Sequence, residues 1–291
     1  MEGIKPKTPE KNFSKKETLK ISCGSFSVAN ENHPGRNEDA IFVDNEENSF
    51  GIFDGMGGHT AGEVASTTAR DFIFNHIEGL ISPDMTIPEV QCLFVDLARQ
   101  TSEALDLKSD LNPQYIGMGT TMSLVKIHQD EEGKFAVVLN IGDSRVYKLS
   151  KDGTLEQISS DDNLLSEEND ISPEEKKIMT KHLDEAKNLE DLSEEEELFF
   201  RKRQVISQCL PKVKHYFPSK TKVNMGDKIL ITSDGIHDNL TYTEIQETLT
   251  GSGSDEDLAR ELVQRAIKRS HEKTMRSKKD DMTAMVISLA E

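Results

Sequence analysis

Acidic residues stand at the ends of several apolar, strand-like segments of this chain. Two such segments end in an Asp-Gly pair, at Asp54 and at Asp234, and two others begin directly after acidic residues, at Glu38-Asp39 and at Asp280. An apolar core that stops at carboxylates without Lys or Arg partners is typical of a site where hard cations hold the carboxylates together. The pattern predicts a divalent metal site, and its oxygen ligands indicate Mg²⁺ or Mn²⁺ rather than Zn²⁺.

Phosphate-ester hydrolysis is a chemistry that suits such a site. It needs an activated water, a counter-charge for the phosphoryl oxygens and a proton for the leaving group, and two divalent ions a few ångströms apart can supply the first two. The glycines after Asp54 remove the Cβ and allow positive φ, so we expect the Gly55 carbonyl to turn toward the same point as the Asp54 carboxylate. Taken alone, this motif is also compatible with an ordinary tight turn.

Five motifs follow one another along the chain: Asp54-Gly-Met-Gly-Gly-His59 with Gly62-Glu63-Val64-Ala65-Ser66, then Gly119-Thr120-Thr121, Gly142-Asp143-Ser144-Arg145, Ser233-Asp234-Gly235 and Asp280-Asp281-Met282-Thr283. In this order they resemble the motifs of the metal-dependent protein phosphatases, the type 2C class, and the bacterial branch most of all. The resemblance spans roughly residues 21–290. An ordered set of motifs is far more specific than any one of them.

The resemblance implies a serine/threonine phosphoprotein phosphatase in which a water bound to two Mn²⁺ or Mg²⁺ ions attacks phosphorus directly, with no covalent intermediate. Carried onto this sequence, it implies that Asp54 bridges the ions, with the Gly55 carbonyl beside it on one of them. Asp234 and Asp280 would complete the coordination of the other ion.

Three further acids rank below these ligands. We expect Glu38 and Asp39 to divide two tasks, binding a metal-bound water and supporting that contact from behind. Asp143 resembles the family residue at a third, weaker metal site. A turn carboxylate that caps Arg145 is the alternative interpretation of Asp143.

Three positions depart from the pattern of the resembled family. Relatives carry a phosphate-binding Arg where this chain has Pro34, so we predict that Arg36 binds the phosphate from a shifted register; an exposed loop arginine is the alternative. His59 lies three residues beyond the place of a family histidine and is a candidate general acid, or a residue that stabilises the glycine loop. Asp281 replaces the usual Asn and adds negative charge beside Asp280, which would tighten metal binding or raise a neighbouring pKa.

The composition limits the location and the partners. No segment approaches about 18 consecutive apolar residues, and the first residues have no apolar stretch suited to a signal peptide, so we expect a cytoplasmic protein with no membrane partner. The net charge of −18 argues against nucleic acid as a partner. The three widely spaced cysteines, Cys23, Cys92 and Cys209, are expected to be reduced thiols rather than zinc ligands. We expect a monomer that acts on a phosphorylated protein.

The elements that must position these residues are strands in blocks, separated by helices. Alternating or β-branched apolar runs predict strands at 40–43, 50–53, 121–127, 135–141, 145–149, 229–232 and 284–289. Capping boxes at Thr86 and Ser254 predict the starts of two helices. This pattern favours an α+β fold, a four-layer αββα sandwich of two antiparallel sheets flanked by helices. Residues 1–20 are expected to form a mobile tail, and residues 21–291 the phosphatase domain.

An acidic segment, residues 161–200, interrupts this pattern. It contains 15 acidic residues and four lysines, a net charge of −11 out of the −18 of the whole chain. Capping boxes at Ser172 and Ser193 predict two helices within it, so we interpret it as a semi-independent helical flap inserted into the domain. The resembled family has a variable flap at this point. A role in substrate selection and a passive solvated insertion both remain open, and we favour the first.

Two other functions compete with the phosphatase. A pseudophosphatase would keep the fold as a binding module, although a scaffold has little need for three clustered acids at Asp54, Asp234 and Asp280. A hydrolase of a small phosphorylated metabolite would use the same metal chemistry, although the open, polar surface of the resembled family suits a protein substrate better. Activity on a phosphopeptide against sugar phosphates distinguishes these functions.

Overall fold

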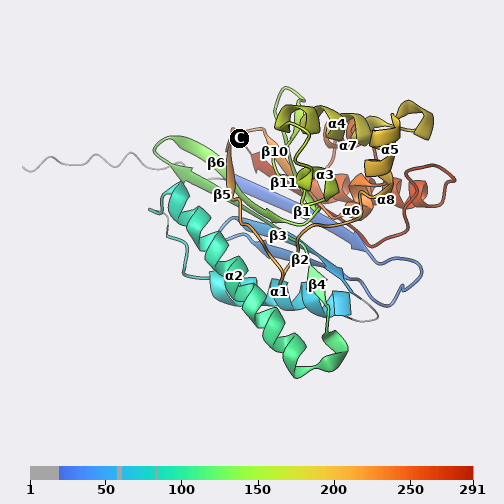
Figure 1. Cartoon of the computed structure of the whole chain (residues 1–291). Coiled ribbons are helices and arrows are strands. Elements are labelled where there is room, and N and C mark those ends of the chain that lie inside the picture. Colours follow the sequence, from blue (N-terminus) through green and yellow to red (C-terminus); the bar gives the residue numbers. More distant parts are fainter. Residues whose placement is uncertain (1–19, 58–60, 83, 291) are drawn as a thin grey trace, which may run out of the picture.

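Two antiparallel sheets packed face to face form the centre of the molecule (Figure 1). The computed structural model describes residues 20–57, 61–82 and 84–290. The first sheet has the strand order β1 (Lys20–Val28), β11 (Met282–Ala290), β10 (Lys228–Thr232), β7 (Arg145–Leu149) and β8 (Leu155–Gln157). The second has the order β2 (Asp39–Asp44), β3 (Ser49–Met56), β5 (Met122–Asp130), β6 (Gly133–Ile141) and β9 (Ser219–Val223), with the short β4 (Gly119–Thr120) beside β3.

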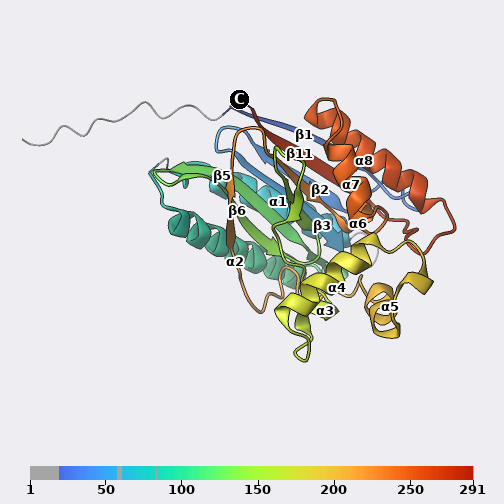
Figure 2. The same cartoon turned by 90° about the horizontal axis from the view of Figure 1, so that it is seen from above.

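Helices cover the outer face of each sheet, as the view from above shows (Figure 2). The second sheet is covered by α1 (Ala61–Ile77) and α2 (Ile87–Leu111), which is followed by the 3₁₀ turn η1 (Pro113–Tyr115). The first sheet is covered by α6 (Asp234–His237), α7 (Tyr242–Leu249) and α8 (Asp255–Ser270). The predicted four-layer αββα sandwich is therefore confirmed.

Alternation along the strands divides the apolar core into layers. In β5, Val125 and Ile127 lie between the two sheets, whereas Leu124 faces α1 and α2. In β11, Ile287 lies between the sheets and Val286 faces the helices α7 and α8. Because successive side chains of a strand point to opposite faces, one apolar strand supplies two layers of the core. This explains why the central strands are apolar at nearly every position.

All the predicted strands occur, with ends that differ by a few residues, and the predicted capping boxes form at Thr86 and Ser254. The prediction missed the helices α1, α3, α6 and α7, the strand β1 and the short strands β4, β8 and β9. The signal for α1 is present in retrospect, because Ala61, Ala65, Ala69 and Ile73 recur every fourth residue and are all buried. Small residues at this spacing let the helix approach β3 closely, but they give a weak hydrophobic pattern.

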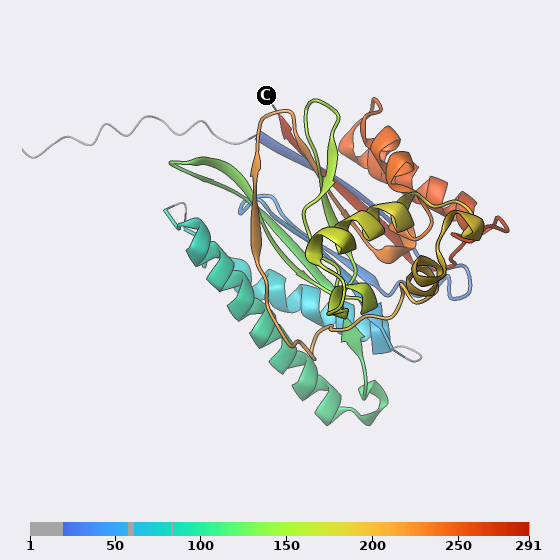
Figure 3. The same cartoon turned by 45° about the horizontal axis from the view of Figure 1, so that its top comes forward.

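The acidic segment forms a flap of short helices that packs beside α7 at one end of the first sheet (Figure 3). Its elements are α3 (Leu164–Glu167), α4 (Pro173–Glu185), the 3₁₀ turn η2 (Leu189–Asp191) and α5 (Glu194–Arg201). The capping boxes predicted at Ser172 and Ser193 are both present. The helical excursion is thus confirmed.

Two arginines of the main domain hold this flap. Arg145, the first residue of β7, donates to Asp184 of α4 at 2.9 Å. Arg276 is 2% exposed and donates to four carbonyl oxygens, two in the flap and two after β10: those of Leu183, Ala186, His237 and Leu240. A buried guanidinium shared in this way ties the two segments together, so the flap is less independent than its sequence suggests.

Two other predictions concern the ends and the surroundings of the chain. Residues 1–19 of the predicted tail lie outside the described residues, and Lys20 already belongs to β1. Within the described ranges, no helix combines the length and the apolar character that crossing a membrane requires. The three cysteines are free thiols.

Candidate metal centre

The register of β2 and β3 places two predicted ligands side by side. Asp39 and Asp54 stand directly opposite each other in this antiparallel pair. The Gly55 amide donates to the Glu38 carbonyl at 3.0 Å, which continues the ladder one step further. Because opposite residues present their side chains to the same face, this end of the second sheet brings the carboxylates of Asp39 and Asp54 together.

The first sheet contributes three more carboxylates at one of its ends. Arg145 of β7, Thr232 of β10 and Ala284 of β11 are partners in the register of neighbouring strands. The residues just before β7, just after β10 and just before β11 therefore lie at the same end of the sheet. These residues include the three predicted ligands Asp143, Asp234 and Asp280.

Ser233 joins the two sheet ends. Its Oγ donates to Oδ2 of Asp39 at 2.8 Å and accepts from the amide of Thr283 at 3.0 Å. The charges of Asp234 and Asp280 act on Asp54, which lies on the opposite sheet. The acids that are far apart in the sequence therefore form one cluster between the ends of the two sheets.

The glycines of the Asp-Gly pairs allow close approach of neighbouring backbone. A Cβ on Gly55 would overlap the carbonyl of Gly62 in α1 and lie 2.7 Å from the Glu38 oxygen. A Cβ on Gly235 would overlap the Asp281 carbonyl. The expectation of positive φ is wrong for Gly55, which lies in β3 with ordinary extended backbone; the next glycine, Gly57, has φ 143°. Removal of the Cβ is the reason for glycine at both Asp-Gly pairs.

Hydroxyl groups of the Gly-Thr-Thr motif fix the backbone of Asp54. The Asp54 amide donates to Oγ1 of Thr121 at 2.9 Å, and Oγ1 of Thr120 donates to the Asp54 carbonyl at 3.0 Å. Oγ1 of Thr121 also lies 2.8 Å from Oγ of Ser144, in the Gly-Asp-Ser-Arg motif. Three of the recognised motifs are therefore connected by hydrogen bonds behind the cluster.

Burial and mutual repulsion raise the pKa values of the clustered acids. Burial raises the pKa of Asp39 to about 8 and that of Asp234 to about 7, where Lys278 opposes the shift. Burial followed by the charge of Asp39 raises the pKa of Asp54 well above its ordinary value, and burial followed by Asp234 does the same for Asp143. Carboxylates in this setting need a nearby cation to remain ionised at neutral pH.

Buried carboxylate oxygens that have no hydrogen-bond partner indicate whether a metal ion fits this site. Within the described ranges, seven buried side-chain polar atoms have no hydrogen-bond partner, and four of them are carboxylate oxygens of predicted ligands: those of Glu38, Asp39, Asp143 and Asp234. A buried carboxylate oxygen without a donor is costly, and a divalent cation removes that cost. Hard oxygen donors suit Mg²⁺ or Mn²⁺. The residues present therefore fit the metal that the motifs imply.

The structure corrects one premise of the sequence argument. We expected the acids to have no Lys or Arg partner, and this is wrong for Asp234 and Asp280. The ammonium of Lys278 forms ion pairs with Asp234, with Asp238 at 3.2 Å and with Asp280 at 2.9 Å. The sequence does not reveal this contact, because Asp234 is 44 residues from Lys278.

Arg36 lies at the edge of the cluster. Its Nη2 is 3.2 Å from Oε1 of Glu38, and about a quarter of its side chain is exposed. Its buried Nε has no hydrogen-bond partner in the described part of the chain. Burial raises the pKa of Glu38, and Arg36 opposes that shift. The arginine is therefore held near the predicted ligands, which an exposed loop arginine would not be.

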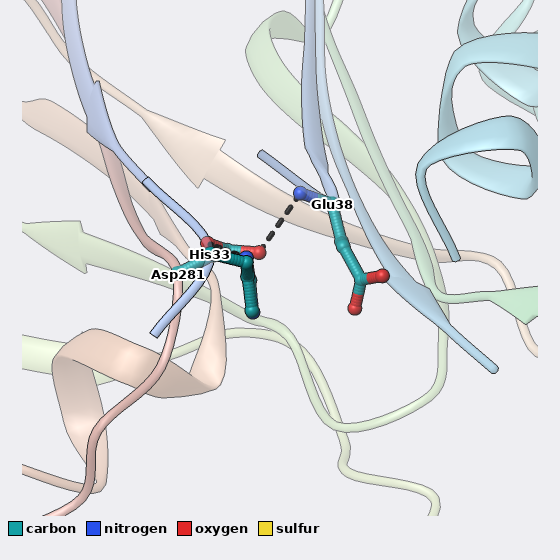
Figure 4. Close-up of side chains that lie close together, drawn as sticks. All are labelled: His33, Glu38 and Asp281. Carbon is teal, nitrogen blue, oxygen red and sulfur yellow. Dashed lines mark hydrogen bonds and ion pairs between the residues drawn. The ribbon is translucent and has the colours of Figure 1, made fainter. Parts of the chain in front are cut away.

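Asp281 ties the loop before β2 to the start of β11. Its carboxylate accepts from the amide of Asn30 at 2.5 Å and from that of Glu38 at 2.8 Å, the second of which is dashed in Figure 4. His33 lies beside Asp281 (Figure 4), and one ligand atom of each of His33, Glu38 and Asp281 lies within 4.8 Å of the other two. Both oxygens of Asp281 thus bind backbone amides. Its charge raises the pKa of Glu38 and of Asp39, although burial is the larger cause at each.

Two predicted site residues remain, His59 and Asp143. His59 lies outside the described residues. The alternative interpretation of Asp143, a cap on Arg145, is wrong, because the ion-pair partners of Arg145 are Asp161 and Asp184. Asp143 itself is buried, with an unpartnered oxygen.

Sequence reasoning did not select Lys278, Asp238 or Ser233. Asp238 had a usable signal, because it lies four residues after Asp234 and therefore on the same side of a helical turn. Lys278 is close to Asp280 in the sequence, but nothing in the local pattern indicates which way its side chain points.

The motifs and the fold together agree with a known family. The family model for protein phosphatase 2C matches residues 30–278. The chain belongs to the protein phosphatase 2C family.

Two bacterial phosphatases are similar to this phosphatase 2C chain in sequence. Serine/threonine protein phosphatase PstP of Mycobacterium tuberculosis is 35% identical over 144 residues, which are 48% of this chain and 25% of PstP. Protein phosphatase PhpP of Streptococcus pneumoniae is 26% identical over 205 residues, 68% of this chain and 71% of PhpP. The match therefore spans a quarter of the length of PstP.

The fold also agrees with a solved structure. The catalytic domain of PstP, crystallised in complex with two manganese ions, aligns with a TM-score of 0.69 at 23% identity and covers 94% of this chain and 100% of that domain. The likeness extends over the whole sandwich, so the fold of this phosphatase 2C chain is the fold of that domain.

Proposed function

We propose that this protein hydrolyses phosphoserine and phosphothreonine in proteins and that it requires two Mn²⁺ or Mg²⁺ ions. The observation that carries the proposal is a set of three buried carboxylate oxygens, of Asp39, Asp143 and Asp234, that have no donor within the described ranges and come from the ends of two different sheets. Buried negative charge of this kind is stabilised when a cation binds to it. The two manganese ions in the structure of the PstP catalytic domain support the choice of metal.

We assign the ligands as the motifs imply. Asp54 would be the ligand shared by both ions, the Gly55 carbonyl would bind one ion, and Asp234 and Asp280 would bind the other. When bound, the ions activate a water for attack on phosphorus and balance the charge of the phosphoryl oxygens. Asp54 suits the shared position because it stands on the second sheet and faces the acids of the first.

Three other acids surround these ligands. Asp39 is hydrogen bonded to Ser233 through one oxygen and keeps the other free. We propose that one of the two residues Asp39 and Glu38 binds a water on the ions and that the other residue supports this contact. Asp143, with its unpartnered oxygen, is assigned to a third and weaker ion.

Arg36 and His59 are proposed to act on the phosphoryl group and the leaving group. The guanidinium of Arg36 is held by Glu38 at the edge of the cluster and still has an unpartnered Nε. Its planar donors suit two oxygens of a phosphoryl group. His59 is proposed to donate a proton to the leaving oxygen, because an imidazole is suited to proton transfer near neutral pH.

The flap is proposed to select substrates. A groove of about 620 Å³ lies between β8 and the flap, and its lining includes Asp161 and three lysines of α4, Lys176, Lys177 and Lys181. Asp161 is paired with Arg145, two residues from Asp143, so the groove begins near the cluster. We propose that polypeptide flanking the phosphorylated residue lies in this groove, and that the charge of −11 on the flap attracts basic substrates over longer distances.

One observation favours the competing function of a binding module. Lys278 supplies Asp234 and Asp280 with a cation from the chain itself, so part of the cluster is neutralised without any metal. The three unpartnered oxygens of Asp39, Asp143 and Asp234 favour the enzyme, because a scaffold that needs no metal has no reason to leave them without donors.

Hydrolysis of a phosphothreonine peptide tests the proposal. We expect turnover with Mn²⁺ or Mg²⁺, loss of turnover in EDTA, and slower release of phosphate from sugar phosphates at equal concentration. Full turnover in EDTA would exclude the two-metal mechanism. Binding of the phosphopeptide without turnover at any metal concentration would identify a pseudophosphatase.

We further propose that the protein acts in the cytoplasm as a monomer. The three free cysteines support a reducing compartment. Sedimentation of the purified protein tests the monomer, and a dimer at micromolar concentration would contradict it.

A further inference from the structure

Lys278 stands among the acids at the first-sheet end of the cluster. Its ammonium contacts Asp234, lies 2.9 Å from Oδ2 of Asp280 and lies 3.2 Å from Oδ2 of Asp238. Only 11% of its side chain is exposed. An ammonium has three donors, and here each of them meets a different carboxylate.

The backbone around Lys278 is fixed, so this placement does not depend on a loose loop. The Lys278 amide donates to Oδ1 of Asn239 at 3.0 Å, and Nδ2 of Asn239 donates to the Lys278 carbonyl at 2.9 Å. The same Nδ2 donates to the Gly235 carbonyl at 2.8 Å, and Asn239 is fully buried. One asparagine therefore holds Lys278 against the helical turn that carries Asp234.

Two of the three carboxylates around Lys278 are proposed metal ligands, and the third is not. Asp238 also accepts from Arg203 at 2.8 Å, so it belongs to the ion pairs beneath the flap. An ammonium at Asp234 and Asp280 repels an incoming divalent ion and occupies one oxygen of each ligand. The same ammonium has Asp238 as an alternative partner when it moves away.

We propose that Lys278 is an internal cation that competes with one divalent ion for Asp234 and Asp280 and moves toward Asp238 when that ion binds. The proposal rests on the proposed metal centre. It predicts two ions of unequal affinity, with the weaker ion at Asp234 and Asp280. It also gives this residue a role in metal affinity that none of the recognised motifs contains.

Calorimetric titration of the EDTA-treated and dialysed protein with MnCl₂ tests the proposal. We expect Lys278→Met to bind the weaker Mn²⁺ about tenfold more tightly, because a charge-assisted hydrogen bond no longer has to be broken. Lys279→Met is the matched control, since Lys279 is exposed and pairs with Glu31 instead. The control should titrate like the unchanged protein. Wild-type affinity for both ions in Lys278→Met would overturn the proposal.

Melting temperatures give a second readout. Metal-free Lys278→Met should have a lower melting temperature than the wild type, because three acids lose their cation. Saturating Mn²⁺ should raise the melting temperature of this variant more than that of the wild type. If Mn²⁺ raised the melting temperatures of the two proteins equally, Lys278 would not compete with the ion.

Lys278→Arg covers the case in which the Met variant does not fold. It keeps the charge and holds two carboxylate oxygens at once, so we expect the weaker Mn²⁺ to bind less tightly than in the wild type. Unchanged or tighter binding in Lys278→Arg would overturn the proposal.

The titration also separates this proposal from the proposed function. Wild-type binding of Mn²⁺ with no effect of Lys278→Met rejects the role of Lys278 and leaves the metal centre intact. Binding of Mn²⁺ by Lys278→Met alone supports the role of Lys278 and makes the wild-type protein a binding module. Absence of binding in every variant rejects both proposals.

Discussion

Buried carboxylates occur in two neighbouring regions of this molecule and are neutralised in different ways. Beneath the flap, Arg145 lies 2.7 Å from Asp161 and 2.9 Å from Asp184. At the metal centre, Asp39 and Asp54 form no ion pair within the described ranges. Both regions are deep and acidic, so burial by itself does not identify a functional site. The lack of a cationic partner at Asp39 and Asp54 is more informative, because a buried charge left without one destabilises the fold unless a ligand compensates.

The two regions meet at Asp238 and Lys278. Asp238 accepts from Arg203 on the flap side and contacts Lys278 on the metal side. The opposing positive charges hold the pKa of Asp238 well below its ordinary value in spite of burial. Asp238 therefore takes part in the ion pairs of both regions.

The largest expected effect is the loss of activity at the metal centre. Asp54→Asn should lower the rate of phosphopeptide hydrolysis by more than about two orders of magnitude, because the ligand shared by both ions is weakened. The metal-free variant should be at least as stable as the wild type, since repulsion within the cluster falls. Steady-state rates and melting temperatures with and without Mn²⁺ measure both effects.

Asp184→Asn, beneath the flap, is the matched control for this variant. It removes the same charge from a paired acid and should leave the rate within roughly tenfold of the wild type. An Asp54→Asn protein that still gained the full wild-type stabilisation from Mn²⁺ would show that Asp54 is not a ligand.

The next effect is a loss of stability beneath the flap. Arg145→Met should lower the free energy of unfolding by about 3 kcal/mol, because it leaves Asp161 and Asp184 buried without their cation. Urea denaturation in EDTA measures this change without a contribution from metal. An unchanged midpoint would mean that these acids are neutral in the folded protein, and the contrast between the two regions would disappear.

A smaller effect concerns pH. The pKa values of Asp39 and Asp234 in the folded protein, about 8 and about 7, lie above the value of about 3.9 expected in the unfolded chain. The folded state therefore binds more protons than the unfolded state in this window, and its stability falls as pH rises from about 4 to about 8. The melting temperature in EDTA should decrease between pH 6 and pH 8.

Saturating Mn²⁺ should oppose this trend, because metal binding requires the deprotonated ligands. Asp39→Asn should show a shallower decrease in EDTA, since it removes one of the two titrating groups. A melting temperature in EDTA that rises through this range would contradict the electrostatic account of the cluster.

The smallest expected effect is on substrate choice. Replacing the exposed Glu190, Glu194 and Glu195 by Gln reduces the flap charge from −11 to −8 and removes no ion pair of the main domain. We expect the preference for basic over neutral phosphopeptides to fall by a small factor at low salt and the difference to vanish at high salt. Hydrolysis of a small aryl phosphate should not change.

This design keeps the contacts that hold the flap. Deletion of the whole flap would remove Asp184 together with the carbonyls that Arg276 binds, and would confuse substrate selection with folding. If peptide preference is unaffected by the three substitutions, the flap is a passive insertion.

Several features could be predicted from the sequence because they depend on neighbours along the chain. The strands appear as apolar runs, and the capping boxes at Thr86, Ser172, Ser193 and Ser254 need only residues three apart. Acids at strand ends indicated the metal centre because adjacent strands of a sheet finish together. The helix α1 escaped detection because its buried face is made of small residues, which carry little hydrophobic signal.

The sequence by itself determined the order of motifs, the alternation of the strands and therefore the four-layer fold. Only the tertiary structure decided which buried acids have a cation. Arg145 pairs with Asp184, which lies 39 residues away, and not with Asp143 two residues before it. Lys278 reaches Asp234 because Asn239 holds their two segments together. Ion pairing depends on which loops meet in space, and that follows from packing of the two sheets rather than from any local pattern.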